Sequence, residues 1–293
     1  MTVHFADFAR EALDKSLEVR EEAGLPFGTP LNVFDLCEML TPKVRVRFAN
    51  YSMEGCYCRS ERPLIEVSAL RPLGRRVFNT AHELGHHALG HTGMRLDEQL
   101  EEGRADPAAE PEEYAANAFA GFLLMPKIGV RRAFTSRGWT IANIVPEQVF
   151  VVACHFGVGY LTLVNHLAYG LREIRLAIAE QLKKARLPAI RQAILGSKGA
   201  GRLWVADRNY VMPTLDTEVG TTLVLPLQSQ PEFDNLVHAG NLPGGRVFAA
   251  VRPGITRVEA AGGWAVTVRI AKYQYSGWST NRHLEPEEGD GDE

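Results

Sequence analysis

The sequence predicts an α+β protein with three domains and a short tail. Apolar residues recur at helical spacing over 73–90 and 111–126, which indicates two amphipathic helices. Short alternating runs before residue 73 indicate strands, and from about residue 200 glycine, proline and β-rich runs dominate. We therefore predict a mixed domain at 1–130, a helical domain at 131–195, an α+β domain at 196–281, and a disordered acidic tail at 282–293.

The first domain is expected to open with two helices and a small antiparallel sheet. The helices are predicted at 1–22 and 33–41, where apolar residues gather on one side. The strands are predicted at 44–48, 55–59 and 64–67, where side chains alternate between apolar and polar. These elements precede the first amphipathic helix and are expected to pack against it.

Composition and charge exclude several protein classes. The chain has 293 residues, 45% of them hydrophobic and 23% charged, and a net charge of −3. Such values are ordinary for a soluble globular protein and argue against a general binder of nucleic acids or membrane surfaces. No run of about 18 apolar residues indicates a membrane span. The N-terminal segment is a mixed-charge amphipathic helix and not a signal peptide, so we expect a cytoplasmic protein.

The four cysteines do not form an evident metal site. Cys56 and Cys58 flank a single tyrosine, but no second pair with suitable spacing follows them. Positions two apart share one face of a strand. We interpret the pair as half-buried strand residues in a reducing compartment.

The most informative residues are His82, Glu83 and His86, which form the pattern His-Glu-x-x-His. On a helix the two histidines lie on one face, about 5–6 Å apart at Cβ, as two ligands of one metal ion require. Glu83 can reach a water held by that metal without binding the metal itself, which is the position of the general base in a zinc peptidase. The pattern therefore predicts metal-assisted peptide hydrolysis.

Three neighbours of this pattern have lesser roles. Gly85 lowers helix propensity, and the close approach of another backbone segment would explain it. His87 and His91 are also four residues apart, but Ala88 follows His87, so that pair has no base. The five-residue offset turns this pair about 140° away from His82 and His86. We interpret His87 and His91 as flanking residues or outer-shell partners.

A catalytic zinc ion needs a third protein ligand and one open position. The longer pattern with a third histidine fails, because Thr92 and Leu89 stand where histidine and glycine are required. The alternative is an acid on the helix at 111–126, where Glu113 shares the core-facing edge and Glu112 points further outward. We predict Glu113 as the third ligand. Taken alone, both acids are also typical of the first turn of a helix.

The helical domain contains a segment with helix-turn-helix spacing, from Ala153 through Gly157 to Leu163. Reading of DNA would be its obvious function, yet no Lys or Arg occurs from Gly138 to Gly170, so phosphate contacts are lacking. The basic residues after it are mixed with apolar positions at helical spacing, which favours a solvated helix face. These patterns argue against direct DNA binding.

The remaining segments carry no catalytic set. Strands are predicted at 222–228, 246–252 and 264–271 in a domain of sensor-like or regulatory type. The acidic segment between the two amphipathic helices is expected to be a solvated loop that borders the substrate cleft.

The two motifs together resemble the ImmA/IrrE family of metallopeptidases. The residues that carry the resemblance are Phe78-x-x-Ala81-His82-Glu83-Leu84-Gly85-His86 and Glu113-x-x-Ala116-Asn117-x-Phe119-Ala120-x-x-Leu123-Leu124-Met125-Pro126. The resemblance implies a thermolysin-like zincin of the gluzincin type, in which His82, His86 and Glu113 bind the metal and Glu83 activates water. It also implies a GAF-like C-terminal domain, where an unknown small-molecule signal would bind.

The resemblance further implies the substrate, which is a helix-turn-helix transcriptional repressor. For Deinococcus-type members of the family, a DdrO-like repressor is cleaved and a regulon for radiation and desiccation damage is released. Two histidines and a carboxylate make Zn²⁺ the expected ion, although Mn²⁺ or another divalent ion can take its place in the cell. Tyr114, Tyr57 and His155 stay open as candidates for stabilising the oxyanion.

Two rival hypotheses belong to other classes. One is a DNA-binding regulator with a vestigial metal site, which predicts salt-sensitive binding to duplex DNA. The other is a ligand-sensing scaffold with a structural metal, which predicts that chelation unfolds the protein and that Glu83→Gln changes nothing.

Overall fold

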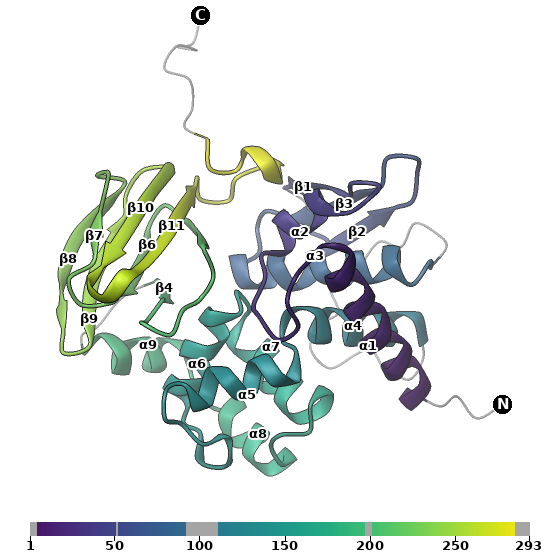
Figure 1. Ribbon diagram of the computed structural model, residues 1–293, viewed down its shortest axis with the longest axis horizontal. Coiled ribbons are helices and arrows are strands. Elements are labelled where there is room, and N and C mark those ends of the chain that lie inside the picture. Colours follow the sequence, from purple (N-terminus) through teal and green to yellow (C-terminus); the bar gives the residue numbers. More distant parts are fainter. Residues whose placement is uncertain (1–4, 51, 92–110, 197–200, 285–293) are drawn as a thin grey trace, which may run out of the picture.

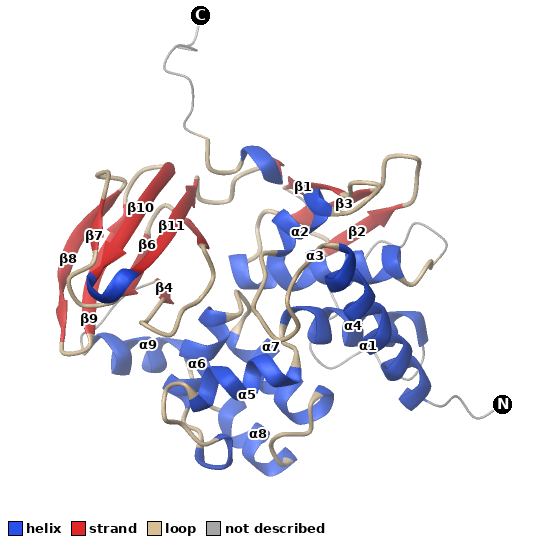
Figure 2. Cartoon of the chain, in the orientation of Figure 1, coloured by secondary structure: helices blue, strands red, loops and turns tan. Residues whose placement is uncertain are grey.

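The computed structural model describes residues 5–50, 52–91, 111–196 and 201–284 and shows a mixed α and β architecture (Figure 1). The acidic segment at 92–110 and most of the predicted tail, from 285 onward, lie outside the described residues. Helices fill the N-terminal and central parts of the molecule, and most strands lie in the C-terminal part (Figure 2). The N-terminal elements are α1 (Phe5–Glu22), α2 (Val33–Met39), β1 (Arg45–Ala49), β2 (Gly55–Cys58), β3 (Leu64–Ser68), α3 (Leu73–Ala88) and α4 (Pro111–Leu124).

The N-terminal sheet is mixed and not wholly antiparallel as predicted. Its strand order is β12-β1-β3-β2, with β1 parallel to β3 and the other pairs antiparallel. The chain passes from β1 through β2 before it reaches β3, so β3 enters between them and runs alongside β1. The fourth strand, β12 (Gly277–Trp278), comes from the far end of the chain. The alternation of single strands could not reveal either the order or this distant partner.

Helices α1, α3 and α4 pack against one another, and α3 also packs against one face of this sheet (Figure 1). Val77, Ala81 and Leu84 form the buried stripe of α3, and α4 buries small residues along most of its length. Arg20 of α1 is fully buried and donates from Nε and Nη2 to the carbonyl oxygen of Leu123, at 3.1 and 2.6 Å. This charge-assisted contact satisfies a carbonyl at the end of α4, which otherwise has no partner within the helix.

The central region is helical, as predicted. It comprises α5 (Lys127–Thr135), α6 (Pro146–His155), α7 (Tyr160–Asn165), a π-helical turn (His166–Gly170), α8 (Leu176–Lys183) and α9 (Leu187–Leu195). Gly157 has a φ of 72°, which allows the tight turn between α6 and α7 that the sequence pattern predicted. In the described part of the chain, no single helix is long and apolar enough to cross a membrane. One bent pair, α6 with residues 160–170, reaches the required length and apolar composition when its two helices are taken together.

The C-terminal region differs from the α+β expectation. Residues 201–284 as described contain strands and short 3-10 turns but no α-helix. Its strands are β4 (Arg202–Val205), β5 (Thr214–Glu218), β6 (Thr221–Leu225), β7 (Gln230–Pro231), β8 (Leu236–Leu242), β9 (Gly245–Ala250), β10 (Gly254–Ala260) and β11 (Trp264–Ala271). They form two four-stranded sheets, β5-β11-β10-β7 and β4-β6-β9-β8, which enclose a separate hydrophobic core. Burial alternates along β10 and β11 of the first sheet, as in a sheet with one buried face.

Buried ion pairs join this region to the N-terminal elements. Arg76 of α3 pairs with Glu218 of β5, and their side chains are only 2% and 5% exposed. Asp216 accepts from Arg269 and Arg282 at 2.6 Å each and from Asn32 at 2.7 Å. Burial raises the pKa of Asp216, but Arg282 and Arg269 lower it more, to about 2. The predicted domain boundaries stay a prediction, and β12 shows that residues 277–278 belong to the N-terminal sheet.

Candidate metal centre

Helix α3 presents His82 and His86 on one face, one turn apart. Both side chains are buried, and their Nε2 atoms lie 3.1 Å from each other. The helix ends just beyond them, where Gly90 has a φ of 72° and the amide of His91 donates to the carbonyl oxygen of His86. This glycine-capped end is the one that the sequence predicted.

Glu113 reaches the same point from the first turn of α4. Its Oε2 is 3.2 Å from His82 Nε2, and its Oε1 is 3.4 Å from His86 Nε2. Burial raises the pKa of Glu113, but hydrogen bonds with His82 and His86 lower it more. The pKa of this carboxyl group is therefore well below its usual range. The three side chains thus present two imidazole nitrogens and one anion to one another.

The spacing of these atoms fits a divalent metal ion. Two ligands held about 2.0–2.1 Å from zinc in a tetrahedron are about 3.3 Å apart, and the observed separations are 3.1, 3.2 and 3.4 Å. Within the described ranges, His82, His86 and Glu113 are the one group of three metal-binding side chains close enough to share an ion. Glu112, the weaker candidate, is not part of it.

The absence of a side chain at position 85 allows α3 and α4 to approach. A Cβ atom at Gly85 would lie 3.1 Å from Ala116 Cα and 3.0 Å from the ring of Phe119. These distances are tighter than ordinary contacts, so a larger residue would push the helices apart and separate Glu113 from the histidines. The close backbone approach predicted for this glycine is confirmed.

Glu83 lies on α3 beside the sheet and is 3% exposed. A Cβ atom at Gly55 would come within 2.6 Å of Glu83 Oε1, so β2 passes directly along this carboxylate. Sequence reasoning did not single out Gly55, although a glycine in a strand is itself a sign of close approach. The contact holds the Glu83 carboxylate against β2, and the role of general base stays a prediction.

Of the two neighbouring histidines, His91 contacts a residue of the site, and His87 contacts Tyr57 of β2. His91 Nδ1 is 2.8 Å from His86 Nδ1, which leaves His86 Nε2 directed at Glu113 and His82. Such a bond to the far nitrogen orients a metal ligand and selects its tautomer. His87 Nδ1 instead bonds to the Tyr57 hydroxyl at 2.7 Å, and burial, with Arg59 nearby, lowers the pKa of His87.

The oxyanion candidates lie in three different surroundings. The Tyr57 hydroxyl is hydrogen-bonded to His87, and Tyr114 is half-buried next to Glu113. His155 packs instead against Tyr210, with ring centroids 6.0 Å apart, and burial followed by the Arg137 charge lowers its pKa to about 3. The contacts of His155 are those of a buried structural residue, while Tyr114 stays a candidate.

The N-terminal half of α3 is anchored to Glu54, the residue directly before β2. Glu54 is 8% exposed and accepts from Arg75 Nε at 3.0 Å and from Asn79 Nδ2 at 2.8 Å. Arg71 makes a further ion pair with the same carboxylate at 3.0 Å. These bonds bind the helix that carries His82 to the beginning of β2, and the sequence pattern did not indicate them.

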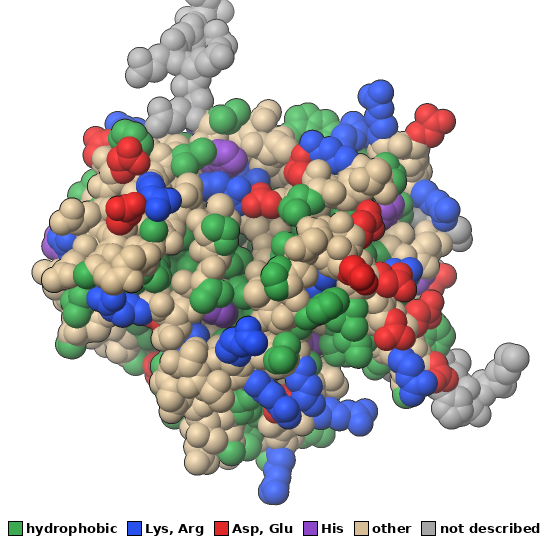
Figure 3. Space-filling view, viewed as in Figure 1, with side chains coloured by type: hydrophobic (Ala, Val, Ile, Leu, Met, Phe, Trp, Pro, Cys, Tyr) green, Lys and Arg blue, Asp and Glu red, His purple; other side chains and the backbone are tan. Residues whose placement is uncertain are grey.

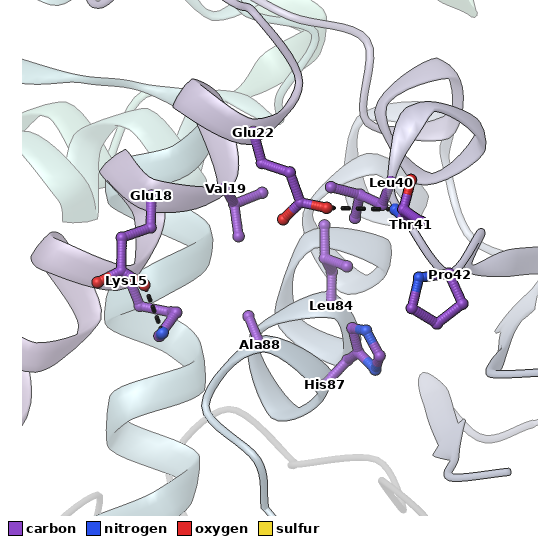
Figure 4. Close-up of a pocket in the computed structure, with 10 residues that line it drawn as sticks. All are labelled: Lys15, Glu18, Val19, Glu22, Leu40, Thr41, Pro42, Leu84, His87 and Ala88. Atoms are coloured by element: carbon purple, nitrogen blue, oxygen red, sulfur yellow. Dashed lines mark hydrogen bonds and ion pairs between the residues drawn. The ribbon is translucent and has the colours of Figure 1, made fainter. Parts of the chain in front are cut away.

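A pocket of about 210 Å³ lies on the opposite face of α3 (Figure 4). Leu84, His87 and Ala88 form one wall, and residues of α1 and of the segment after α2 form the others. Its volume is below the roughly 300 Å³ at which small-molecule sites begin. We therefore assign it no ligand.

Comparison with known proteins identifies one domain. Residues 38–168 match the model of the IrrE N-terminal-like domain, a peptidase family designated M78. No curated protein matches the chain. Among solved structures, a transcriptional regulator of Mycobacterium tuberculosis is similar with 16% identity and a TM-score of 0.34, over 56% of this chain and 46% of that one. The chain thus spans less than half of the regulator, and so distant a likeness does not bear on the site.

The matched range includes α3, α4 and the whole candidate metal centre. Together with the two motifs, the match shows that residues 38–168 form an IrrE N-terminal-like domain.

Proposed function

We propose that the protein is a metal-dependent, site-specific endopeptidase that cleaves a helix-turn-helix transcriptional repressor in the cytoplasm. The convergence of His82, His86 and Glu113 at 3.1–3.4 Å, with Glu83 adjacent, is the observation that supports it most. The family resemblance supports the finer part: a DdrO-like repressor whose loss releases a regulon for radiation and desiccation damage.

Each site residue has a defined task in this proposal. His82, His86 and Glu113 hold the ion, with Zn²⁺ preferred and Mn²⁺ or another divalent ion as the alternative. The ion supplies Lewis-acid chemistry, polarising the scissile carbonyl and acidifying the attacking water. Glu83 takes a proton from that water and delivers it to the leaving amine, as a general base and then a general acid. His91 keeps His86 in the orientation that directs Nε2 inward.

Strand β2 supplies a place for the substrate. It is the edge strand of its sheet among the described residues, and Gly55 brings it against Glu83. An edge strand offers backbone donors and acceptors to a further extended chain. A peptide paired with this edge would lie alongside Glu83, which suits cleavage within an extended segment.

The test is incubation of the Zn²⁺- or Mn²⁺-loaded protein with a helix-turn-helix repressor, followed by intact-mass analysis. Wild type should make one discrete, metal-dependent cut, and Glu83→Gln should lose about 100-fold or more of the rate while it still binds the ion. Glu112→Gln is the matched control, because it neutralises an acid outside the metal-binding group.

Equal cutting by Glu83→Gln and wild type would refute the role of Glu83. Unfolding on chelation, with no cutting by any form of the protein, would support a ligand-sensing scaffold with a structural metal. In that case the C-terminal region, for which we propose a GAF-like sensor role, would be the place to seek a small-molecule ligand.

A second candidate, a DNA-binding regulator, is supported by a separate observation. Lys and Arg side chains gather over the central helical region (Figure 3), and several are exposed with no ion pair among the described residues. These are Arg132, Arg172, Arg175, Lys184 and Arg186. Helix α7 itself has no basic residue. Tight duplex binding that falls steeply with salt, without repressor cleavage, would favour this candidate.

A further inference from the structure

The N-terminal sheet carries a second cluster of reactive side chains on the face turned away from α3. The register places Cys56 opposite Glu66 and Cys58 opposite Leu64, and Glu66 in turn lies beside Arg47 of β1. Residues directly opposite each other share one side of a sheet. Glu66 and the half-exposed Arg47 form an ion pair at 3.5 Å there. Both cysteines therefore belong to the outer face of the sheet.

The two sulfur atoms are close neighbours. Cys56 Sγ and Cys58 Sγ are 3.7 Å apart, and both thiols are free. Strand residues two apart have Cα atoms about 6.6 Å from each other, which is within the upper range for disulfides. A disulfide bond is about 2 Å long, so closure needs the sulfurs to approach by about 1.7 Å. A modest bend of β2 would supply that approach.

We propose that Cys56 and Cys58 are a dithiol modification site that a peroxide closes to a disulfide within strand β2. The Cys58 thiolate attacks the peroxide O–O bond, which gives a sulfenic acid and one molecule of water or alcohol. The Cys56 sulfur then attacks the Cys58 sulfur, and a second water leaves as the S–S bond forms. Two thiols are oxidised by two electrons, one peroxide is reduced, and an added dithiol reverses the reaction.

The surroundings of the two thiols set this order of attack. Cys58 is partly exposed, whereas Cys56 is 3% exposed. Burial, followed by the hydrogen bond with Cys58, raises the pKa of Cys56 to about 12. A peroxide therefore reaches Cys58 first, and the buried Cys56 reacts with its oxidised neighbour.

The same strand connects the dithiol to the metal centre. Gly55 and Tyr57 alternate with the cysteines and face α3, where Gly55 abuts Glu83 and the Tyr57 hydroxyl bonds to His87. Tyr57 is the residue enclosed by the proposed disulfide. A bend that draws the two sulfurs together must therefore move Tyr57 and shift β2 against Glu83. Closure would perturb α3 through these two contacts.

The test uses the purified full-length chain, treated with hydrogen peroxide and then trapped with an alkylating reagent. The peptide that contains residues 56 and 58 should lose two hydrogen atoms and resist alkylation, and dithiothreitol should restore both properties. The buried Cys37 and Cys154 serve as internal controls and should be alkylated only after unfolding. In Cys58→Ser, Cys56 should remain a thiol under the same treatment, with circular dichroism as the check of folding.

Amide hydrogen exchange provides a readout of the coupling that needs neither metal nor substrate. Closure should speed exchange in α3 by about tenfold relative to the reduced protein, because two of its contacts are disturbed. A peptide that stays reduced, or that gains oxygen atoms without forming the disulfide, would overturn the modification site. A disulfide with unchanged exchange in α3 would overturn the coupling. Neither result depends on the proposed peptidase activity, which the repressor assay tests separately.

Discussion

Buried polar side chains are arranged in opposite ways in the candidate metal centre and at the junction with the C-terminal region. At the junction, Asp216 and Glu218 face arginines, so each negative charge has a positive partner in the protein. At the metal centre, two imidazoles and a carboxylate converge, and Glu83, the next residue after His82, is also buried. Buried charges are stable when they are paired or when they coordinate metals. The first arrangement therefore joins the C-terminal region to the N-terminal elements, whereas the second is suited to binding a cation.

The largest effect is expected at the junction. Glu218→Gln would leave Arg76 charged and buried without its partner, and removing one member of a buried pair typically costs about 3–5 kcal/mol. Urea denaturation should show this loss in the free energy of unfolding. The matched control is Asp234→Asn, because Asp234 and Arg252 form an ion pair whose side chains are 77% and 56% exposed. That change should cost less than about 1 kcal/mol, and equal losses would contradict the comparison.

At the metal centre, the corresponding change should affect the ion more than the fold. Glu113→Gln replaces the anionic ligand with a neutral amide, and we expect affinity for Zn²⁺ to fall by about 100-fold or more, since even outer-shell changes cost 10- to 100-fold. Competition with a chromogenic chelator measures the affinity. Glu112→Gln, in the same helical turn, should bind Zn²⁺ like wild type. Similar losses in the two variants would show that general charge near α4, not coordination, is responsible.

The sequence revealed the metal centre better than the junction, for a physical reason. His82, His86 and Glu83 lie within five consecutive positions, so helical geometry alone relates them, and the turn-forming Pro111 places Glu113 near the start of the next helix. Arg76 and Glu218 are 142 positions apart, and only the folded chain brings them together. The same applies to β12, whose two residues complete a sheet begun more than 200 residues earlier.

The apolar–polar pattern of single strands also failed to predict the sheet, because several strand arrangements satisfy that pattern equally well. Alternation in β1, β2 and β3 indicates which residues face the core, but it does not show whether neighbouring strands run parallel. The prediction of an antiparallel sheet was therefore wrong. Gly85 was the opposite case. A glycine between two metal ligands has a cost in helix stability, and the close contact with Ala116 accounts for it.

Acid should weaken the junction in a defined pH window. The pKa of Asp216 is lowered to about 2 in the folded protein by Arg282 and Arg269, which outweigh burial. A depressed pKa contributes stability that is present above the unfolded value near 3.9 and is lost as pH falls toward 2. The difference corresponds to about 3 kcal/mol. Chemical denaturation from pH 5 to pH 2 should show this loss in wild type, and Asp216→Asn should flatten that part of the profile. An unchanged slope in the variant would assign the acid sensitivity to other carboxylates.

The smallest effect tests whether helix spacing governs the metal centre. Gly85→Ala adds one methyl group against Ala116 and Phe119, and overpacking of this kind costs about 1–3 kcal/mol. Part of the strain should appear as a shift of α4 away from α3, so Zn²⁺ affinity should fall together with stability. Gly244→Ala is the matched control, since a Cβ there meets nothing within 4 Å. If Gly85→Ala lowers stability but binds Zn²⁺ as tightly as wild type, Glu113 can follow the histidines without close packing. The spacing of α3 and α4 would then serve the core and not the site.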